Sequence, residues 1–304
     1  MPTRRPIQFG GILLLCAVAA CAHGPAGAPP TAPAPNAGPA APAPNTGAAA
    51  SAPVASGAAV VTPSPSAGPA ATCAGFRAGG VAVSLTYDDS LQSQIDHAGP
   101  DLAKYGLSGT FFIEDVRPDP TPWAALRAQG HELGSHTMIH PCPRINTWVK
   151  PGMASEDYDL ARMNAELDDS VALLRSLGQT GPLSFAYPCG VTTVGDAHDS
   201  YIPAVKARFA AARRVDSVVA KPSVDLYMTP GIFMTSAGSA LIARVTAAAR
   251  GGGGWVIFGF HGVGGDHLSV TREAHAELLA YLAAHRDTVW TAPFGTVAQC
   301  LRGS

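Results

Sequence analysis

The chain has 304 residues, of which 47% are hydrophobic and 14% charged, and its formal net charge at pH 7 is -2. Because this balance is near neutral and no cluster of Lys and Arg stands out, nucleic acid is excluded as an expected partner. This average composition combines two regions that differ strongly. Residues 1–72 are too poor in large apolar side chains to build a core, whereas residues 73–304 suffice for one large domain.

Residues 1–20 have the pattern of an export signal. Two arginines give a cationic start, and the apolar stretch at 10–20 is too short to span a membrane stably. Small residues then lead into Cys21, which resembles a bacterial lipoprotein signal in which this cysteine is lipidated. An ordinary secretory signal cut next to Cys21 is the alternative. We expect the chain to be exported to the cell envelope and anchored there to a membrane by its lipid.

Residues 21–72 consist, after the cysteine, almost entirely of Ala, Pro, Gly, Ser and Thr, and the pentapeptide Ala-Pro-Ala-Pro-Asn occurs at 32–36 and 41–45. Such a segment has little to bury, and frequent proline favours extended conformations. At about 3 Å per residue it would reach on the order of 100 Å or more. We interpret it as a disordered spacer between the anchor and the domain; a tail without a role is the alternative.

Strand-like and helix-like segments alternate through residues 73–304. The predicted strands are short apolar or β-branched runs at 81–87, 109–113, 132–135, 183–187, 255–260 and 289–291. The predicted helices, with helical apolar spacing or glycine stops, lie at 96–105, 122–129, 157–177, 202–208, 241–249 and 272–285. This alternation predicts an α/β fold of parallel strands and crossover helices, either a barrel or an open sheet.

Polar residues follow several of the predicted strands. Asp88 and Asp89 follow the first strand, His136 the third, Cys189 a later one and His261 the most apolar one. The strand ends of a (β/α) barrel share one mouth, so these residues are expected to form a single site.

Two carboxylates and two histidines supply the chemistry of that site. Asp88 and Asp89 are adjacent, and His136 and His140 are four residues apart, a spacing that places both imidazoles on one face of a helical turn. Together they provide three ligands and one spare base, which is what a divalent metal needs to activate water. The alternative to a metal site is that Asp88 and Asp89 lie in a solvated turn and that the two histidines lie in a polar loop held by hydrogen bonds. His261, followed by glycines, suits a general acid.

Four cysteines lie in the domain, at positions 73, 142, 189 and 300. An even number in an exported protein predicts two disulfides, for which three pairings exist. We favour Cys73 with Cys300, which bracket the domain, and Cys142 with Cys189, which both follow segments of the expected site. A Cys₂His₂ zinc site is the alternative, although no C-x-x-C pair is present.

Four motifs, in their order and approximate spacing, resemble the polysaccharide deacetylase family, carbohydrate esterase family 4. They are Thr86-Tyr-Asp-Asp-Ser90, His136-Thr-Met-Ile-His-Pro141, Tyr187-Pro-Cys-Gly190 and Phe260-His-Gly262. The resemblance covers roughly residues 80–300. It implies a distorted (β/α) barrel and metal-dependent removal of acetyl groups from sugars.

The resemblance also implies a role for each matching residue. The metal, Zn²⁺ or alternatively Co²⁺ or Ni²⁺, would be held by Asp89, His136 and His140. Asp88 would be the general base and His261 the general acid. The backbone N–H of Cys189 would stabilise the oxyanion.

Two departures from the family's motifs concern the surroundings of this site. Phe185-Ala-Tyr187 stands where the third motif carries an arginine that orients the base, and Ser90 replaces the glycine of the first motif. Arg213, Arg214 and Asp216 lie in the region of the fourth motif, and we expect one of them to tune Asp88 or His261.

We therefore expect a metal-dependent hydrolase that removes acetyl groups from an envelope or extracellular polysaccharide, with N-deacetylation of a GlcNAc-type glycan favoured. An esterase acting on O-acetylated xylan or another glycan is the first alternative. A non-catalytic, glycan-binding lipoprotein on the same fold is the second. We expect a monomer.

Overall fold

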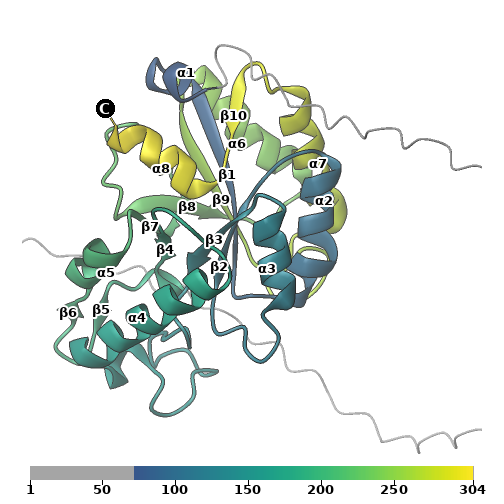
Figure 1. Ribbon diagram of the computed structural model, residues 1–304. Helices are drawn as coiled ribbons and strands as arrows, with labels where there is room; N and C mark the ends of the chain where they lie inside the picture. Colours follow the sequence, from purple (N-terminus) through teal and green to yellow (C-terminus); the bar gives the residue numbers. More distant parts are fainter. Residues whose placement is uncertain (1–71, 304) are drawn as a thin grey trace, which may run out of the picture. The chain divides into compact units, whose positions relative to one another are not determined.

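The computed structural model describes residues 72–303 (Figure 1). The expected signal peptide at 1–20, Cys21 and all of the expected linker except Thr72 lie outside the described residues. Among residues 72–303, no helix combines the length and the apolar character needed to cross a bilayer.

The described domain alternates helices and strands, as the sequence predicts. The helices are α1 (Cys73–Arg77), α2 (Gly99–Lys104), α3 (Thr121–Ala128), α4 (Leu160–Ser176), α5 (Ile202–Arg208), α6 (Gly238–Arg250), α7 (Arg272–Ala284) and α8 (Phe294–Arg302). The strands are β1 (Val81–Asp88), β2 (Thr110–Ile113), β3 (Glu132–Ser135), β4 (Ser184–Ala186), β5 (Thr193–Val194), β6 (Asp199–Ser200), β7 (Ala211–Asp216), β8 (Thr229–Phe233), β9 (Gly254–Phe260) and β10 (Val289–Thr291).

Seven parallel strands close into a barrel in the order β1-β2-β3-β4-β7-β8-β9, and β9 pairs back onto β1. The barrel is distorted at β1. Its first residues, Val81–Val83, pair with β10, whereas its last, Thr86–Asp88, pair with β2. Helices surround the strands (Figure 1). The predicted distorted (β/α) barrel is confirmed.

The residues of β1 alternate between two cores. Val83, Leu85 and their odd-numbered neighbours belong to the large core, together with buried residues of α2 and α7. Even-numbered residues face the barrel interior, where the Ser84 hydroxyl accepts the indole N–H of Trp255 at 3.0 Å. Both faces of β1 are buried, yet its sequence alternates, because the even-numbered residues after Ala82 are the polar Ser84, Thr86 and Asp88. Asp88 is the last even-numbered residue and lies at the barrel mouth.

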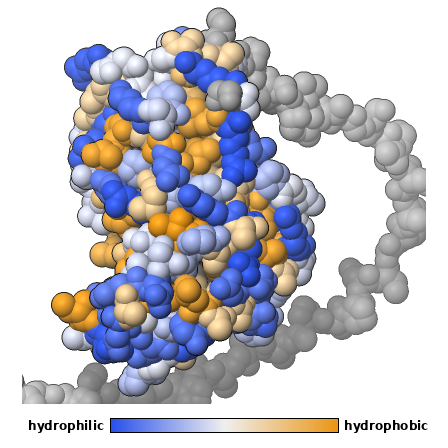
Figure 2. Space-filling model, turned by 90° about the vertical axis from the view of Figure 1, so that its left-hand side faces the viewer, coloured by the Kyte–Doolittle hydropathy of each residue, from blue (hydrophilic) through white to orange (hydrophobic). Residues whose placement is uncertain are grey.

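The opposite end of the barrel is closed by α8. The buried carboxylate of Glu132 accepts hydrogen bonds from the Thr110 and Ser184 hydroxyls and from the backbone N–H of Gly295, at 2.6–2.8 Å. Phe294 stacks on Trp255 inside the barrel. On the face that carries α5 and α8, hydrophilic residues cover most of the surface and hydrophobic ones form smaller patches (Figure 2).

Several elements differ from the sequence prediction. Strands β7 and β8, helices α1 and α8 and the β5–β6 hairpin were not predicted, while the helix predicted at 96–105 is a π-helical turn at Gln94–Ala98 followed by α2. The helix predicted at 157–177 begins only at Leu160, because the Asp159 side chain caps it by accepting the Arg162 N–H. Strand β8 contains Pro230 and Gly231, which are poor strand formers, so its sequence indicates a loop.

Two buried histidines make the fold sensitive to acid. Burial lowers the pKa of His131 and of His275 from 6.5 to about 4. Below pH 6.5 the unfolded chain binds protons that the folded chain does not, so the free energy of unfolding falls between about pH 6.5 and pH 4, by about 2–3 kcal/mol per histidine. Urea unfolding across this range measures the effect. We expect a shallower slope for His131→Asn, whereas an unchanged slope would contradict this account.

Candidate metal centre and active site

Asp88 and Asp89 reach the same cavity although they are adjacent in the chain. Asp88 ends β1 pointing into the barrel mouth, and a regular strand would turn Asp89 to the opposite side. The backbone instead adopts positive φ at Asp89 (73°) and at Ser90 (54°), and Asp88 and Asp89 both line the cavity. Ser90 stands where the family motif has glycine, and its hydroxyl accepts the Glu114 N–H at 2.8 Å. That bond offsets part of the strain of its backbone.

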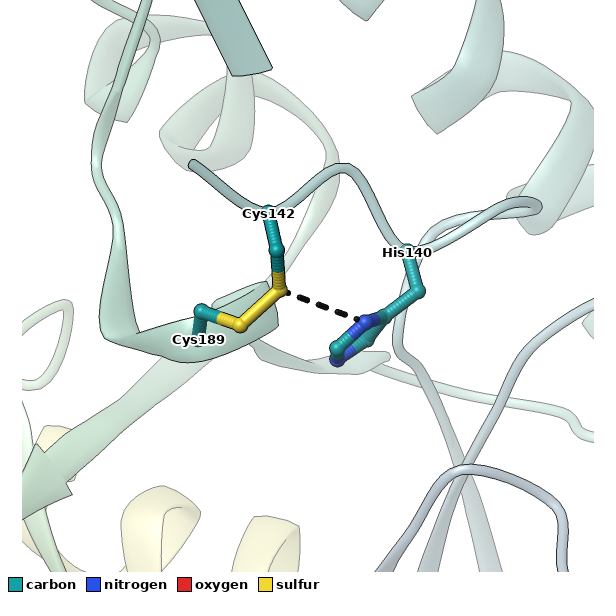
Figure 3. A group of neighbouring side chains, drawn as sticks. All are labelled: His140, Cys142 and Cys189. Atoms are coloured by element: carbon teal, nitrogen blue, oxygen red, sulfur yellow. Dashed lines mark hydrogen bonds between the residues drawn. A yellow bond between two sulfur atoms is a disulfide. The ribbon is translucent and has the colours of Figure 1, made fainter. Parts of the chain in front are cut away.

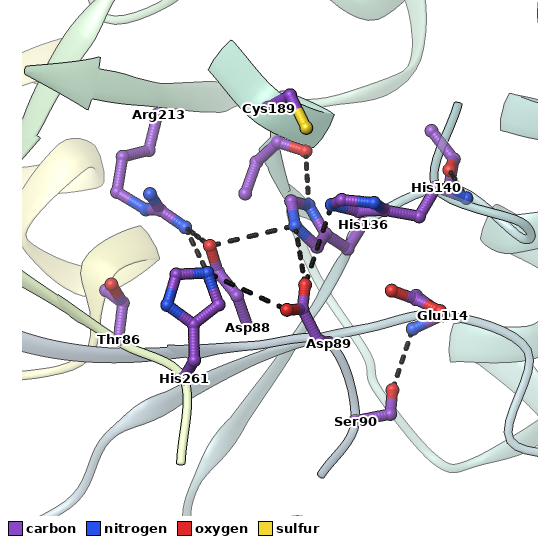
Figure 4. A network of polar contacts seen from close by, with 12 residues as sticks. Thr86, Asp88, Asp89, Ser90, Glu114, His136, His140, Cys189, Arg213 and His261 are labelled. Atoms are coloured by element: carbon purple, nitrogen blue, oxygen red, sulfur yellow. Dashed lines mark hydrogen bonds and ion pairs between the residues drawn. The ribbon is translucent and has the colours of Figure 1, made fainter. Parts of the chain in front are cut away.

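Asp89, His136 and His140 converge on one point (Figure 4). The Oδ1 atom of Asp89 lies 3.4 Å from Nε2 of His136 and 3.5 Å from Nε2 of His140. One ligand atom from each of the three residues lies within 4.8 Å of the other two. Both imidazoles and the carboxylate can therefore bind a single cation.

Each imidazole is held with Nε2 turned toward Asp89. The Nδ1–H of His136 donates to the carbonyl oxygen of Ala186 at 2.8 Å, and Nδ1 of His140 lies 3.4 Å from Sγ of Cys142. A partner on the second ring nitrogen fixes the orientation of a metal-binding histidine. The structure thus presents both Nε2 atoms as ligands.

The charges around Asp89 require a cation or a proton. Oδ1 of Asp89 is buried without a hydrogen-bond donor. Burial raises the pKa of Asp89, but His136 and His140 outweigh this effect and hold that pKa well below its usual range. Burial lowers the pKa of His136, yet the charges of Asp88 and Asp89 prevail and raise it to about 9. The three residues fit a divalent cation, which would displace the His136 proton.

A second group of possible ligands, His140, Cys142 and Cys189, does not form a metal site (Figure 3). Cys142 and Cys189 are joined in a disulfide, so neither offers a thiolate. Cys73 and Cys300 form the other disulfide. Both predicted pairings are confirmed, and the alternative Cys₂His₂ zinc site is wrong.

Asp88 lies beside the ligand cluster and is held by Arg213. Nη2 of Arg213 lies 2.5 Å from Oδ1 and 2.6 Å from Oδ2 of Asp88, and both side chains are buried. The guanidinium sits between the rings of Phe112 and Phe233. A side chain at Gly231 would come within 2.6 Å of Cδ of Arg213, so glycine makes room for it.

Arg213 reaches Asp88 from the strand next to the third motif, which has no arginine in this chain. In the sheet, Ala186 pairs with Arg213 on the next strand. The guanidinium thus reaches Asp88 from β7 instead of β4. Of the three residues expected to tune Asp88 or His261, Arg213 contacts Asp88. Asp216 instead accepts a hydrogen bond from Arg214, and among the described residues no hydrogen bond or ion pair joins Asp216 to Asp88 or His261.

His261 follows β9 and faces Asp89 from the side opposite His140. Its Nε2 lies 3.7 Å from Oδ2 of Asp89, and its ring packs on Phe233 with centroids 5.1 Å apart. Burial lowers its pKa below the usual value. Cys189, above the cluster in Figure 4, has positive φ (52°) in the turn after β4 and lines the same cavity.

Two further polar residues at this cavity were not predicted. Glu114, directly after β2, lies on the side of Asp89 away from Arg213 (Figure 4), and burial raises its pKa to about 7. Its position after a strand was the same signal that identified Asp88. His267 donates from Nε2 to Oδ2 of Asp89 at 2.8 Å, and no spacing in the sequence indicates this contact.

The cavity over these residues has a volume of about 710 Å³ and a largely apolar wall. Its lining includes four of the exposed large hydrophobic side chains of the domain, namely Ile139, Trp148, Val215 and Leu268. An apolar mouth over a polar floor is typical of a small-molecule or polymer binding site.

Residues 77–199 match the family described as polysaccharide deacetylase. A Bacillus sp. protein named gellan lyase is 26% identical over 239 residues, which cover 72% of this chain but only 9% of that relative.

Two solved structures are similar to this chain, and the first of them shares its fold. A Mycobacterium smegmatis structure titled as a polysaccharide deacetylase has 15% identity and a TM-score of 0.50, covering 74% of this chain and 91% of the other. The peptidoglycan deacetylase PdaC from Bacillus subtilis has 14% identity and a TM-score of 0.47, covering 74% and 93%.

Proposed function

We propose that this chain is a polysaccharide deacetylase, the family that residues 77–199 match, and that it removes acetyl groups from a polysaccharide with the help of a divalent metal. One observation carries the proposal. Two imidazole nitrogens and the donor-free Oδ1 of Asp89 converge on one point beside Asp88. The ligands would be Asp89, His136 and His140. Two imidazoles and one carboxylate favour Zn²⁺, with Co²⁺ or Ni²⁺ as alternatives.

In the proposed mechanism, a divalent cation supplies polarisation of the acetyl carbonyl and acidification of the attacking water. Asp88 takes the proton of that water, and Arg213 holds its carboxylate in place. The backbone N–H of Cys189 donates to the oxyanion, an interaction worth about 3 kcal/mol when well placed. His261 then protonates the leaving atom.

The substrate we favour is an N-acetylated glycan. An amine leaves only when it is protonated, and His261 lies at the cavity to supply the proton. An O-acetyl ester depends less on such an acid, so an O-acetylated xylan or glycan is the second candidate. A comparison of amide and ester substrates in His261→Ala distinguishes the two: an amide-specific enzyme should lose most of its amide activity.

Trp148 offers a surface for a sugar ring next to the metal centre. Its side chain is 62% exposed, and its ring lies 6.3 Å from that of His140, with an angle of 28° between the planes. In the loop that carries it, Arg144 pairs with Asp157 at 2.8 Å. A large apolar ring held in solvent beside a cavity suits the C–H face of a pyranose.

We expect Trp148→Ala to raise KM for an acetylated oligosaccharide about tenfold, which corresponds to about 1.4 kcal/mol of binding. Turnover of the small ester p-nitrophenyl acetate should not change. Ile145→Ala is the matched control, because Ile145 lies in the same loop, is 86% exposed and does not line the cavity. Equal KM values for the Trp148 variant and the wild type would contradict this role.

Acetate release tests the function directly. The full chain is incubated with peptidoglycan, chitin oligomers and acetylated xylan, first as purified, then after chelation, and then with Zn²⁺ restored. We expect release that stops on chelation and returns with Zn²⁺. If the chain binds Zn²⁺ and these glycans yet releases no acetate, the alternative of a non-catalytic, glycan-binding lipoprotein is favoured.

We also propose that the chain acts as a monomer in the cell envelope, anchored to a membrane through lipid on Cys21. The support is the sequence of residues 1–21. Membrane fractionation of the wild type and of Cys21→Ser tests the anchor, since the variant should be released from the membrane.

A further inference from the structure

His267 contacts the carboxylate of a proposed metal ligand from outside the ligand cluster. Its Nε2 lies 2.8 Å from Oδ2 of Asp89, whereas the other oxygen, Oδ1, faces His136 and His140. An ionised carboxylate only accepts hydrogen bonds, so Nε2 of His267 is the donor. The His267 side chain is 54% exposed. The hydrogen bond to Asp89 joins this side chain to the rest of the domain.

The loop after β9 is folded tightly enough to place His267 there. The Gly262 N–H donates to the carbonyl oxygen of His267 at 3.1 Å, and Val270 N–H donates to that of Gly262 at 3.0 Å. The carboxylate of Asp266 accepts the Ser93 N–H at 2.7 Å, which ties the loop to the segment after β1. A Cβ at Gly262 would lie 1.9 Å from the Gly265 carbonyl oxygen, so the turn requires glycine.

We propose that His267 is a positioning residue that donates to Oδ2 of Asp89 and holds Oδ1 toward the cation. The inference rests on the proposed metal site and deepens it. Hydrogen bonds from a neighbouring residue to a ligating carboxylate fix its orientation, and their loss typically costs 10–100-fold in metal affinity. The cluster whose ligand atoms all lie within 4.8 Å of one another contains Asp89, His136 and His140 but not His267. His267 therefore acts through Asp89 instead of binding the metal.

The test compares metal binding by the full chain and its variants. In His267→Ala we expect the Kd for Zn²⁺ to rise 10–100-fold. The absorption spectrum of the Co²⁺-saturated variant should match that of the wild type, because the ligands are unchanged. His267→Gln keeps an N–H near the position of Nε2 and should recover most of the lost affinity. His285→Ala, which removes an imidazole bonded to the carbonyl oxygen of Tyr281, is the control and should bind like the wild type.

Three results would overturn the inference. Unchanged Zn²⁺ affinity in His267→Ala would show that the contact does not support Asp89. An altered Co²⁺ spectrum would make His267 a ligand. A Gln variant as weak as the Ala variant would exclude the donated hydrogen bond. A wild-type chain that binds neither Zn²⁺ nor Co²⁺ would instead refute the proposed function, so the two failures are distinguishable.

Discussion

Replacing Asp88 by asparagine is expected to lower kcat for acetyl release by about 10²–10⁴-fold, the usual contribution of a general base. Asparagine has nearly the same shape and can still accept a hydrogen bond from Arg213, but it cannot take a proton from water. The metal ligands are untouched, so Zn²⁺ affinity should change little. Steady-state acetate release and a Zn²⁺ titration of the same preparation measure the two effects separately.

The same substitution should also destabilise the fold. Arg213 is 1% exposed, and a buried charge that loses its partner costs about 3–5 kcal/mol. Asp101→Asn is a matched control, because it breaks another well-formed ion pair, to Arg272 at 2.9 Å, away from the cavity. It should lose some stability and keep its kcat. If Asp88→Asn keeps kcat within tenfold of the wild type, Asp88 is not the base.

The contact between Arg213 and Asp88 could not be predicted from the sequence alone. The four motifs predicted the ligand cluster because each one follows a strand, and parallel strands bring their ends together. The sequence showed that Phe185-Ala-Tyr187 stands where the family's third motif has an arginine, and that Arg213, Arg214 and Asp216 lie further along the chain. That Arg213 is the one that contacts Asp88 became visible only from the pairing of Ala186 with Arg213 on the next strand. Pairing register depends on the whole barrel, and spacing along the chain does not reveal it.

The same limit applies to the strands themselves. Strand β1 was predicted from its apolar, β-branched residues at 81–85, and β9 from its strongly apolar sequence. Strand β7 was missed because it carries Arg213 into the interior, and β8 because Pro230 and Gly231 interrupt it. Gly231 is there to leave space for that arginine. The two strands that were missed thus carry the arginine that contacts Asp88 and the glycine that makes room for it.

The two disulfides are expected to have different effects when they are removed. Cys73–Cys300 closes a loop with a sequence separation of 227 and joins α1 to α8, away from the cavity. The double variant C73S/C300S should lose about 4–5 kcal/mol of stability, because the unfolded chain gains freedom over a long loop. Its kcat and Zn²⁺ affinity should remain those of the wild type. Urea unfolding together with acetate release measures both quantities.

Cys142–Cys189 has a sequence separation of 47, and C142S/C189S should lose about 3–4 kcal/mol. This pair also supports the site, since Sγ of Cys142 contacts Nδ1 of His140 and Cys189 carries the proposed oxyanion donor at positive φ. We therefore expect lower kcat and weaker Zn²⁺ binding at temperatures where the variant remains folded. If C142S/C189S loses only stability, as C73S/C300S should, the disulfide does not position His140 or the Cys189 N–H. The oxyanion would then need another donor at the cavity.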